Sequence, residues 1–269
     1  MENAHNFKQK TFGERIKTML KVDFRRILKS KTFYIIIAAS LVLPIIMTVM
    51  MSMMDGTVSI NPQTGEETVM RGPENAWQNI GTLPGGENMG GTEIFAMCNV
   101  NMAFMGVAVF ICLFISDDFR SGYAKNLFAV RAKKGEYVVS KTLSGFVCGS
   151  LMIIAYFLGS MLGGAISGLS FSLMGLSVGN IVMCLLAKIF LMLVFVSIFV
   201  LVSVAAKQRA WLSITGSLGG GMLLFMTVSM ITPLNSTPIN VLLSALGGAM
   251  FAIGLGFASR TVLDKTSLV

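Results

Sequence analysis

Charged residues are scarce in this sequence, and long stretches lack them almost completely. Only 13% of the 269 residues are charged, about half the usual fraction, while 54% are hydrophobic. Six apolar runs of 20 to 26 residues account for this bias, and Lys188 is the only charged residue within any of them. The runs cover residues 33–54, 94–116, 143–166, 181–206, 211–231 and 239–258.

These runs have the length and composition of membrane-spanning helices. About 20 residues rising ~1.5 Å each cross a hydrocarbon core of ~30 Å, and in lipid each backbone amide must be paired within the protein. We therefore predict an all-α membrane protein with six transmembrane helices in one domain over residues 32–260. A flexible N-terminus (1–10) and an amphipathic helix (11–31) precede it, and a tail (261–269) follows.

The residues of common catalytic and metal sites are missing. His5 is the only histidine, so neither a His-Glu metal motif nor a Ser-His-Asp set is present, which argues against an intramembrane protease or hydrolase. The cysteines lie in apolar runs without C-x-x-C spacing, so we expect reduced packing residues and no zinc site. They are Cys98, Cys112, Cys148 and Cys184.

A nucleotide site is missing as well. A phosphate-binding loop reads G-x-x-x-x-G-K-[ST], but the glycines at 219–221 lie in an apolar run and no lysine follows them. We therefore expect no enzymatic activity and no cofactor bound by this chain.

Lysine and arginine are distributed unevenly among the connecting segments. Nine precede the first run, six lie between the second and third, two join the fourth and fifth, and two follow the sixth. The opposite side holds only Arg71. Because connecting segments rich in lysine and arginine stay on the cytoplasmic side, both termini are predicted to be cytoplasmic. The protein is predicted to be multi-pass in a bacterial cytoplasmic membrane. The net charge of +8 follows from this orientation and not from nucleic-acid binding.

The one long segment on the outer side covers residues 55–93. It carries acidic residues, glycine and proline, and two interpretations stand for it: a flexible loop, or a short helix beginning near Pro73. In the second interpretation Trp77 rests at the membrane interface. No large external domain is predicted.

The segment before the first run predicts an amphipathic helix. Thr11 and Glu14 have the spacing of a capping box, and apolar residues recur after them at helical period. Since basic residues occupy another face, we expect this helix to lie in the inner membrane interface, with a cytosolic helix as the alternative. The residues expected to face lipid are Phe12, Ile16, Met19, Leu20, Phe24 and Ile27.

The cytoplasmic segment 117–141 mixes acidic, basic and aromatic residues around a glycine. This mixture suits a short helix that docks on another protein, with apolar anchors in a socket and charges around its rim. A solvated basic loop that only sets the topology is the alternative.

The order of these segments, together with the motif residues of segment 117–141, resembles the type-2 ABC transporter permeases, the membrane subunits of many bacterial exporters. The family's loop after the second span typically has an acidic residue, a glycine, Lys-Asn-Leu, an arginine and a Ser-Lys or Gly-Lys pair. Family members often carry glutamate where Asp118 stands. The matching residues are Asp118, Gly122, Lys125, Asn126, Leu127, Arg131, Tyr137, Ser140 and Lys141.

The resemblance implies partners. In that family two permeases face each other, each on a separate ATPase, the N-terminal helix is an elbow along the inner leaflet, and the loop after span two is a coupling helix. We therefore expect a homodimer, an ABC ATPase subunit that holds ATP and Mg²⁺, contact with membrane lipids and no nucleic acid. The expected ATPase-coupling residues are Asp117, Asp118, Phe119, Arg120, Gly122, Tyr123, Lys125, Asn126, Leu127 and Arg131.

The resemblance also implies export of an amphipathic or hydrophobic substrate. A small peptide is the first candidate, because the apolar bundle is narrow and has no large outer domain. Lipid or drug export is the first alternative, and a membrane protein that binds a peptide without pumping it is another.

Lys188 is the one charge inside a span, where a charge costs at least ~2.5–3.5 kcal/mol. It lines a translocation path if the fourth span begins near Ile181, whereas its ammonium snorkels outward if the crossing begins near Lys188 itself, which we prefer. Asn99 and Asn101 are weaker path candidates, with interhelical hydrogen bonding as the alternative. Three G-x-x-x-G pairs predict helix packing: they are Gly145/Gly149, Gly159/Gly163 and Gly216/Gly220.

Overall fold

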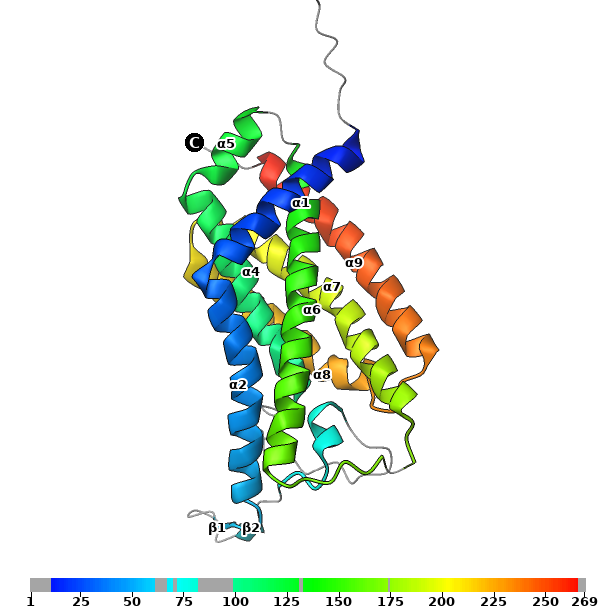
Figure 1. The fold of residues 1–269 in the computed structure, drawn as a ribbon. Helices are drawn as coiled ribbons and strands as arrows, with labels where there is room; N and C mark the ends of the chain where they lie inside the picture. The colour runs from blue at the N-terminus through cyan, green and yellow to red at the C-terminus, as the bar shows by residue number, and fades with distance from the viewer. Residues whose placement is uncertain are drawn as a thin grey trace, which may run out of the picture.

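A computed structural model describes residues 11–60, 67–69, 72–81, 99–130, 133–173 and 175–265. Over these residues the chain is a bundle of long helices with one short two-stranded hairpin (Figure 1). The helices are α1 (Phe12–Lys29), α2 (Lys31–Met53), α4 (Ala103–Arg120), α5 (Tyr123–Val130), α6 (Lys134–Ile166), α7 (Val178–Ala206), α8 (Ala210–Ile231) and α9 (Pro238–Lys265).

The two ends of the bundle are built differently (Figure 1). At one end, called here the α5 end, α1 lies obliquely across the bundle near α5 and the start of α6. At the other, called the hairpin end, β1 (Val58–Ile60) pairs antiparallel with β2 (Glu67–Val69). The 3₁₀ helices η1 (Ala76–Asn79) and η2 (Val100–Met102) complete the described elements.

Among the described residues, five helices are long and apolar enough to cross a membrane: α2, the segment Val100–Arg120, α6, α7 and α9. In α8 the apolar stretch Ala210–Phe225 is shorter. The mainly helical fold and the existence of long apolar helices are therefore as predicted, whereas the count of six spans stays a prediction. The one addition is the short β1–β2 hairpin in the connection after α2, which leaves the all-α fold class unchanged.

Several helices extend beyond the predicted apolar runs at the α5 end. α4 continues past Ser116 to Arg120, and α6 begins at Lys134 rather than at Leu143. The predicted loop 117–141 is therefore mostly helical, with a turn at Gly122, whose positive φ of 76° favours glycine. Hydropathy marks only the part of a helix that lipid touches, because a helix leaving the membrane continues with polar side chains.

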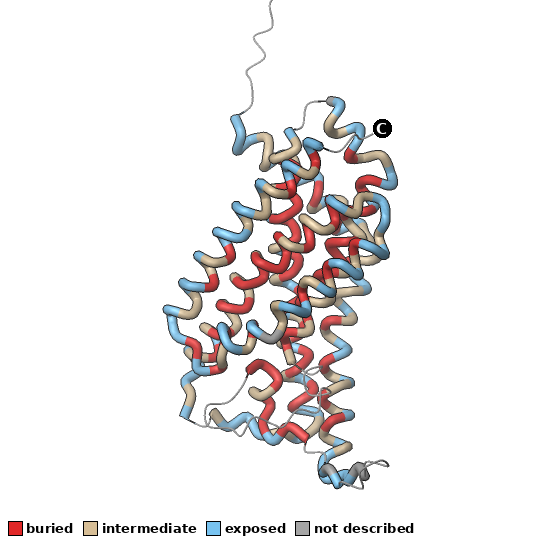
Figure 2. The backbone as a smooth tube through the Cα atoms, turned by 180° about the vertical axis from the view of Figure 1, so that it is seen from behind, coloured by how far each residue is buried: buried red, intermediate tan, exposed pale blue. Residues whose placement is uncertain are grey.

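The core lies between α4, α6 and α7. The rings of Phe104 on α4 and Phe195 on α7 are 4.4 Å apart, and both side chains are fully buried. Figure 2 shows this buried centre and an exposed exterior. α2 and α9 are the least buried of the five spans, and their outward side chains, such as Leu43 and Leu246, are large, apolar and exposed. That pattern is typical of helices that face lipid.

Close helix contact depends on the predicted small residues. A Cβ atom at Gly159 of α6 would overlap the carbonyl oxygen of Leu41 on α2. One turn further, a Cβ at Gly163 would lie 3.0 Å from the Cα of Ile45. Any side chain at these two positions would push α2 away from α6, so the packing interpretation of this G-x-x-x-G pair is confirmed.

At the hairpin end η1 is held by hydrogen bonds to two other segments. The Asn75 amide donates to the Ser172 carbonyl oxygen over 2.7 Å, and the Asn79 amide donates to Thr48 Oγ1 over 3.0 Å. The Trp77 indole donates to the carbonyl oxygen of Phe171 over 3.1 Å. Residues 75–80 thus form a fixed helical turn, as the second interpretation of the outer segment expected, and residues 82–98 lie outside the described chain.

Candidate coupling site at the α5 end

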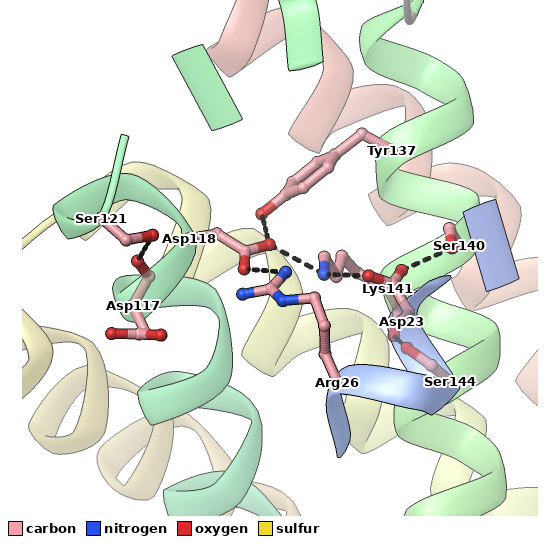
Figure 3. A network of polar contacts seen from close by, with 9 residues as sticks. All are labelled: Asp23, Arg26, Asp117, Asp118, Ser121, Tyr137, Ser140, Lys141 and Ser144. Carbon is pink, nitrogen blue, oxygen red and sulfur yellow. Dashed lines mark hydrogen bonds and ion pairs between the residues drawn. The ribbon is translucent and has the colours of Figure 1, made fainter. Parts of the chain in front are cut away.

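Six side chains from three helices form a polar cluster just inside the α5 end (Figure 3). α1 contributes an acid and a base, α4 an acid, and α6 a base and two hydroxyl groups. We call this set the α1–α4–α6 cluster, and it consists of Asp23, Arg26, Asp118, Tyr137, Ser140 and Lys141.

Asp118 lies at the centre of the cluster and has no solvent exposure. Its Oδ1 is 2.6 Å from Nη1 of Arg26, and its Oδ2 is 2.8 Å from Nζ of Lys141. The phenolic hydroxyl of Tyr137 donates a hydrogen bond to the same Oδ2 over 2.9 Å. One carboxylate therefore joins α1, α4 and α6.

Asp23 completes the charge balance from the other side. Its Oδ1 lies 2.7 Å from Nζ of Lys141, and its Oδ2 accepts a hydrogen bond from Ser140 Oγ over 2.6 Å. The cluster holds two carboxylates and two cations and is neutral. A neutral set of paired charges is the form in which charges are tolerated away from water.

Local sequence places these groups on matching faces. Tyr137, Ser140 and Lys141 stand at i, i+3 and i+4, which puts them on one face of α6. Asp23 and Arg26 are likewise three residues apart on α1. The capping box predicted at the start of α1 is confirmed, and it fixes where this helix begins.

Aromatic rings enclose the two cations. The Arg26 guanidinium carbon lies 4.1 Å from the ring centroid of Tyr123, and Lys141 Nζ lies 4.0 Å from that of Phe114. Burial alone would lower the pKa of Arg26, but the charge of Asp118 and its hydrogen bond outweigh it, so the pKa is raised. Burial, followed by the negative charge of nearby Asp23, raises the pKa of Tyr123. Arg26 thus keeps its charge, while Tyr123 stays neutral.

Two of the residues expected to contact an ATPase are buried in this structure. Asp118 is buried and occupied by Arg26 and Lys141, and Phe119 is only 8% exposed because its ring packs edge-on against Tyr137. Neither side chain is available to a docking protein.

The remaining predicted coupling residues divide by exposure. Tyr123 and Leu127 are half-buried, Gly122 makes the α4–α5 turn, and Arg131 lies outside the described chain. The exposed ones are Asp117, Arg120, Lys125 and Asn126. These four polar side chains are exposed at the end of α4 and on α5, and we call them the α4–α5 surface.

α1 faces the bundle more than predicted. Ile27, expected at the lipid interface, is 1% exposed, and Met19 packs against the core. Arg15 of α1 also pairs with Glu136 of α6 over 2.8 Å. Phe12 remains exposed, and the other predicted interface residues, Ile16, Leu20 and Phe24, are half-buried.

Sequence reasoning missed Asp23 and Arg26 as cluster members. The one available signal is that Asp23 is the single acidic residue after Glu14 in an otherwise basic helix. An acid has no reason to lie at a basic membrane-facing helix unless it has a specific partner.

Lys188 occupies neither of the places considered for it. It is fully buried, and its ammonium donates to Asn101 Oδ1 over 2.6 Å and to Thr232 Oγ1 over 2.9 Å. Asn101 donates in turn to Ser229 Oγ over 3.1 Å, and Asn99 caps η2. Lys188 therefore neither reaches outward nor lines an open path in this structure, and it ties α7 to η2 and to the end of α8.

Long apolar helices and a buried polar cluster at one end define a multi-pass integral membrane protein. The family model of the ABC-2 family transporter proteins matches residues 19–223, which span α1 from its second turn to most of α8. The chain belongs to the ABC-2 transporter family, and it is thus a permease of an ABC exporter of the cell membrane, a class that associates with an ABC ATPase subunit. No curated protein and no solved structure matches the chain.

Proposed function

We propose that this chain is the membrane subunit of an ATP-driven exporter and that a separate ATPase subunit binds ATP and Mg²⁺. In this proposal the chain has six spans, both termini are cytoplasmic, and the α5 end faces the cytoplasm. The strongly uneven distribution of lysine and arginine supports this orientation. α1 serves as the elbow helix, and α5 serves as the coupling helix.

The observation that carries the coupling role is the pairing of an exposed polar surface with a buried cluster directly behind it. Asp117 on the α4–α5 surface is 57% exposed, while the next residue, Asp118, belongs to the α1–α4–α6 cluster. A movement imposed on the end of α4 reaches α1 and α6 through the bonds of Asp118. The ATPase thus engages the surface, and the cluster transmits its movement to the bundle.

The transported molecule in this proposal is a small amphipathic peptide, and two copies of the chain enclose its path. The wide apolar faces of α2 and α9 support a substrate that partitions into the membrane. Stimulation of ATPase activity by amphipathic peptides, but not by lipids or small hydrophobic drugs, in a reconstituted complex would support the assignment. Stimulation by lipids or drugs alone would overturn it.

Charge reversal on the α4–α5 surface tests the docking. Lys125→Glu should release the co-purifying ATPase subunit, because Lys125 is exposed on α5 and makes no ion pair with the rest of the described chain. The matched control is Lys265→Glu, which reverses an exposed lysine at the end of α9. Full recovery of the ATPase with Lys125→Glu, or equal loss with both variants, would contradict the assignment.

A further inference from the structure

A pocket of about 920 Å³ lies between α1, α6 and α9 at the α5 end, apart from the α1–α4–α6 cluster. This volume is near the top of the ~300–1,000 Å³ range of small-molecule sites. α9 contributes one wall from Ala249 to Asp264, a distance of roughly 22 Å at ~1.5 Å per residue. The pocket is therefore a long slot that follows the helices rather than a round cavity.

The slot is charged at one end and apolar at the other. Its apolar lining includes Leu143 of α6, Leu193 of α7 and Ile253 of α9, of which Leu143 and Ile253 are exposed, and Thr142 is the one uncharged polar side chain. The charged lining residues lie at the α5 end of the slot, which we call its mouth. They are Arg15, Lys133, Lys134, Glu136, Arg260 and Asp264.

Positive charge exceeds negative charge at the mouth. Four of these six side chains are basic and two are acidic, so the lining carries two positive charges net. Asp264 is shared by two cations: its Oδ1 lies 3.5 Å from Nζ of Lys134, and its Oδ2 lies 3.6 Å from Nε of Arg260. Lys133 makes no ion pair with any residue of the described chain. Among the described lining residues, positive charge is thus in excess, and a bound anion would balance it.

Small residues keep the slot open. Ala249, Ala252 and Gly256 line it from α9, and a Cβ at Gly256 would lie 4.0 Å from the Cγ1 of Val138 on α6. A longer side chain at any of the three would fill the space between the helices.

We propose that this slot holds one anionic phospholipid of the inner leaflet. Its phosphate lies between Lys133 and Arg260, and one acyl chain runs along α9 toward Ala249. Basic pockets between membrane helices on the cytoplasmic side have the chemistry that binds such headgroups. A zwitterionic lipid would match the apolar wall but would leave the two positive charges uncompensated. Because Phe12 and Arg15 of α1 line the mouth, the lipid also connects the elbow helix to α9.

Quenching of a tryptophan in the slot by brominated lipid tests the proposal. The reporter Phe257→Trp and the control Phe251→Trp both replace exposed rings on α9, and of the two only position 257 lines the slot. Both are made with Trp77→Phe and Trp211→Phe and placed in phosphatidylcholine vesicles containing about one tenth dibromo-phosphatidylglycerol. We expect the quenched fraction of the tryptophan fluorescence at position 257 to be about five times that mole fraction. At position 251 the quenched fraction should equal it.

Substitutions of the basic residues proposed to bind the headgroup distinguish a specific site from general electrostatic attraction of anionic lipid. Lys133→Gln and Arg260→Gln should each weaken the preference at 257 about fivefold, the effect of one basic contact, whereas Lys265→Gln outside the slot should leave it unchanged. Equal quenching by dibromo-phosphatidylcholine and dibromo-phosphatidylglycerol would overturn the proposal. Quenching at 251 but none at 257 would also overturn it, because another helix or a second copy of the chain would then fill the slot.

A second measurement needs no reporter. Native mass spectrometry of the complex with its original tryptophans should show one phosphatidylglycerol retained per chain. Retention should fall with Lys133→Gln and persist with Lys265→Gln. Equal retention in these two variants would contradict the assigned headgroup position. Since none of these readouts requires transport, a failure here leaves the proposed export function standing.

Discussion

Asp118 and Asp117 are adjacent in sequence, yet the same substitution should affect them very differently. Asp118→Asn removes one of the two negative charges of the α1–α4–α6 cluster, so Arg26 and Lys141 then share Asp23 alone. Breaking a buried ion pair from one side costs about 3–5 kcal/mol. Asp117 is 57% exposed and lies 3.9 Å from an Arg120 that is 77% exposed. Asp117→Asn should therefore cost at most about 1 kcal/mol.

The chain carries its own probe for this comparison. Cys112, Cys148 and Cys184 are free and buried, so a thiol-reactive dye added to the purified protein reports unfolding as they become accessible. At ~2–4 °C per kcal/mol for a domain of this size, Asp118→Asn should lower the midpoint by on the order of 10 °C, and Asp117→Asn by a few degrees at most. The double variant Asp118→Asn with Arg26→Gln restores neutrality and should recover part of the loss. Equal midpoints for the two single variants would refute the buried-cluster reasoning.

Further predictions follow from the other contacts. Lys188→Met should change the free energy of unfolding by about 1 kcal/mol or less, because relief of a buried charge offsets two lost hydrogen bonds. Lys188→Arg should lower the unfolding temperature, because the buried site has no room for the larger guanidinium group. Gly159→Ala should cost at least about 1–3 kcal/mol, the scale of core overpacking, because it separates α2 from α6. Gly254→Ala, with nothing near its Cβ, should be neutral or stabilising in a thermal melt. In intact cells a cysteine at exposed Glu74 should react with an impermeant maleimide and one at exposed Arg209 should not; the opposite labelling would reverse the orientation. The purified chain alone should neither bind nor hydrolyse ATP, and turnover without a partner would contradict the proposed division of labour.

Hydropathy predicted the spans because the lipid core imposes both length and apolarity on each helix independently of the rest of the chain. Hydropathy did not predict the helix ends for the same reason. α6 begins nine residues before Leu143, over a stretch that includes Glu136 and Lys141, and each of these charged side chains has a partner on another helix. A single sequence carries no record of which distant residue will neutralise a charge.

Lys188 shows the same limit from inside the membrane. Sequence reasoning weighed only water-accessible destinations for its charge, an outer surface or a path. The structure gives a third, in which Asn101 and Thr232, 87 and 44 residues away, solvate the ammonium within the bundle. Both partners are ordinary polar residues whose positions acquire meaning only when η2 and the end of α8 are brought beside α7.

The position of the α1–α4–α6 cluster also explains why the motif of segment 117–141 could be recognised in the sequence although the contacts of its residues could not be predicted. Asp118, Tyr137 and Lys141 belong to the matching pattern, and all three are buried and bonded to one another. They hold the end of α4 to α6 and do not present a face to a partner. The exposed residues between them, such as Lys125, are the ones free to make intermolecular contact. In this chain the buried members of the motif hold the end of the bundle together, and under the proposed function its exposed members form the surface that an ATPase engages.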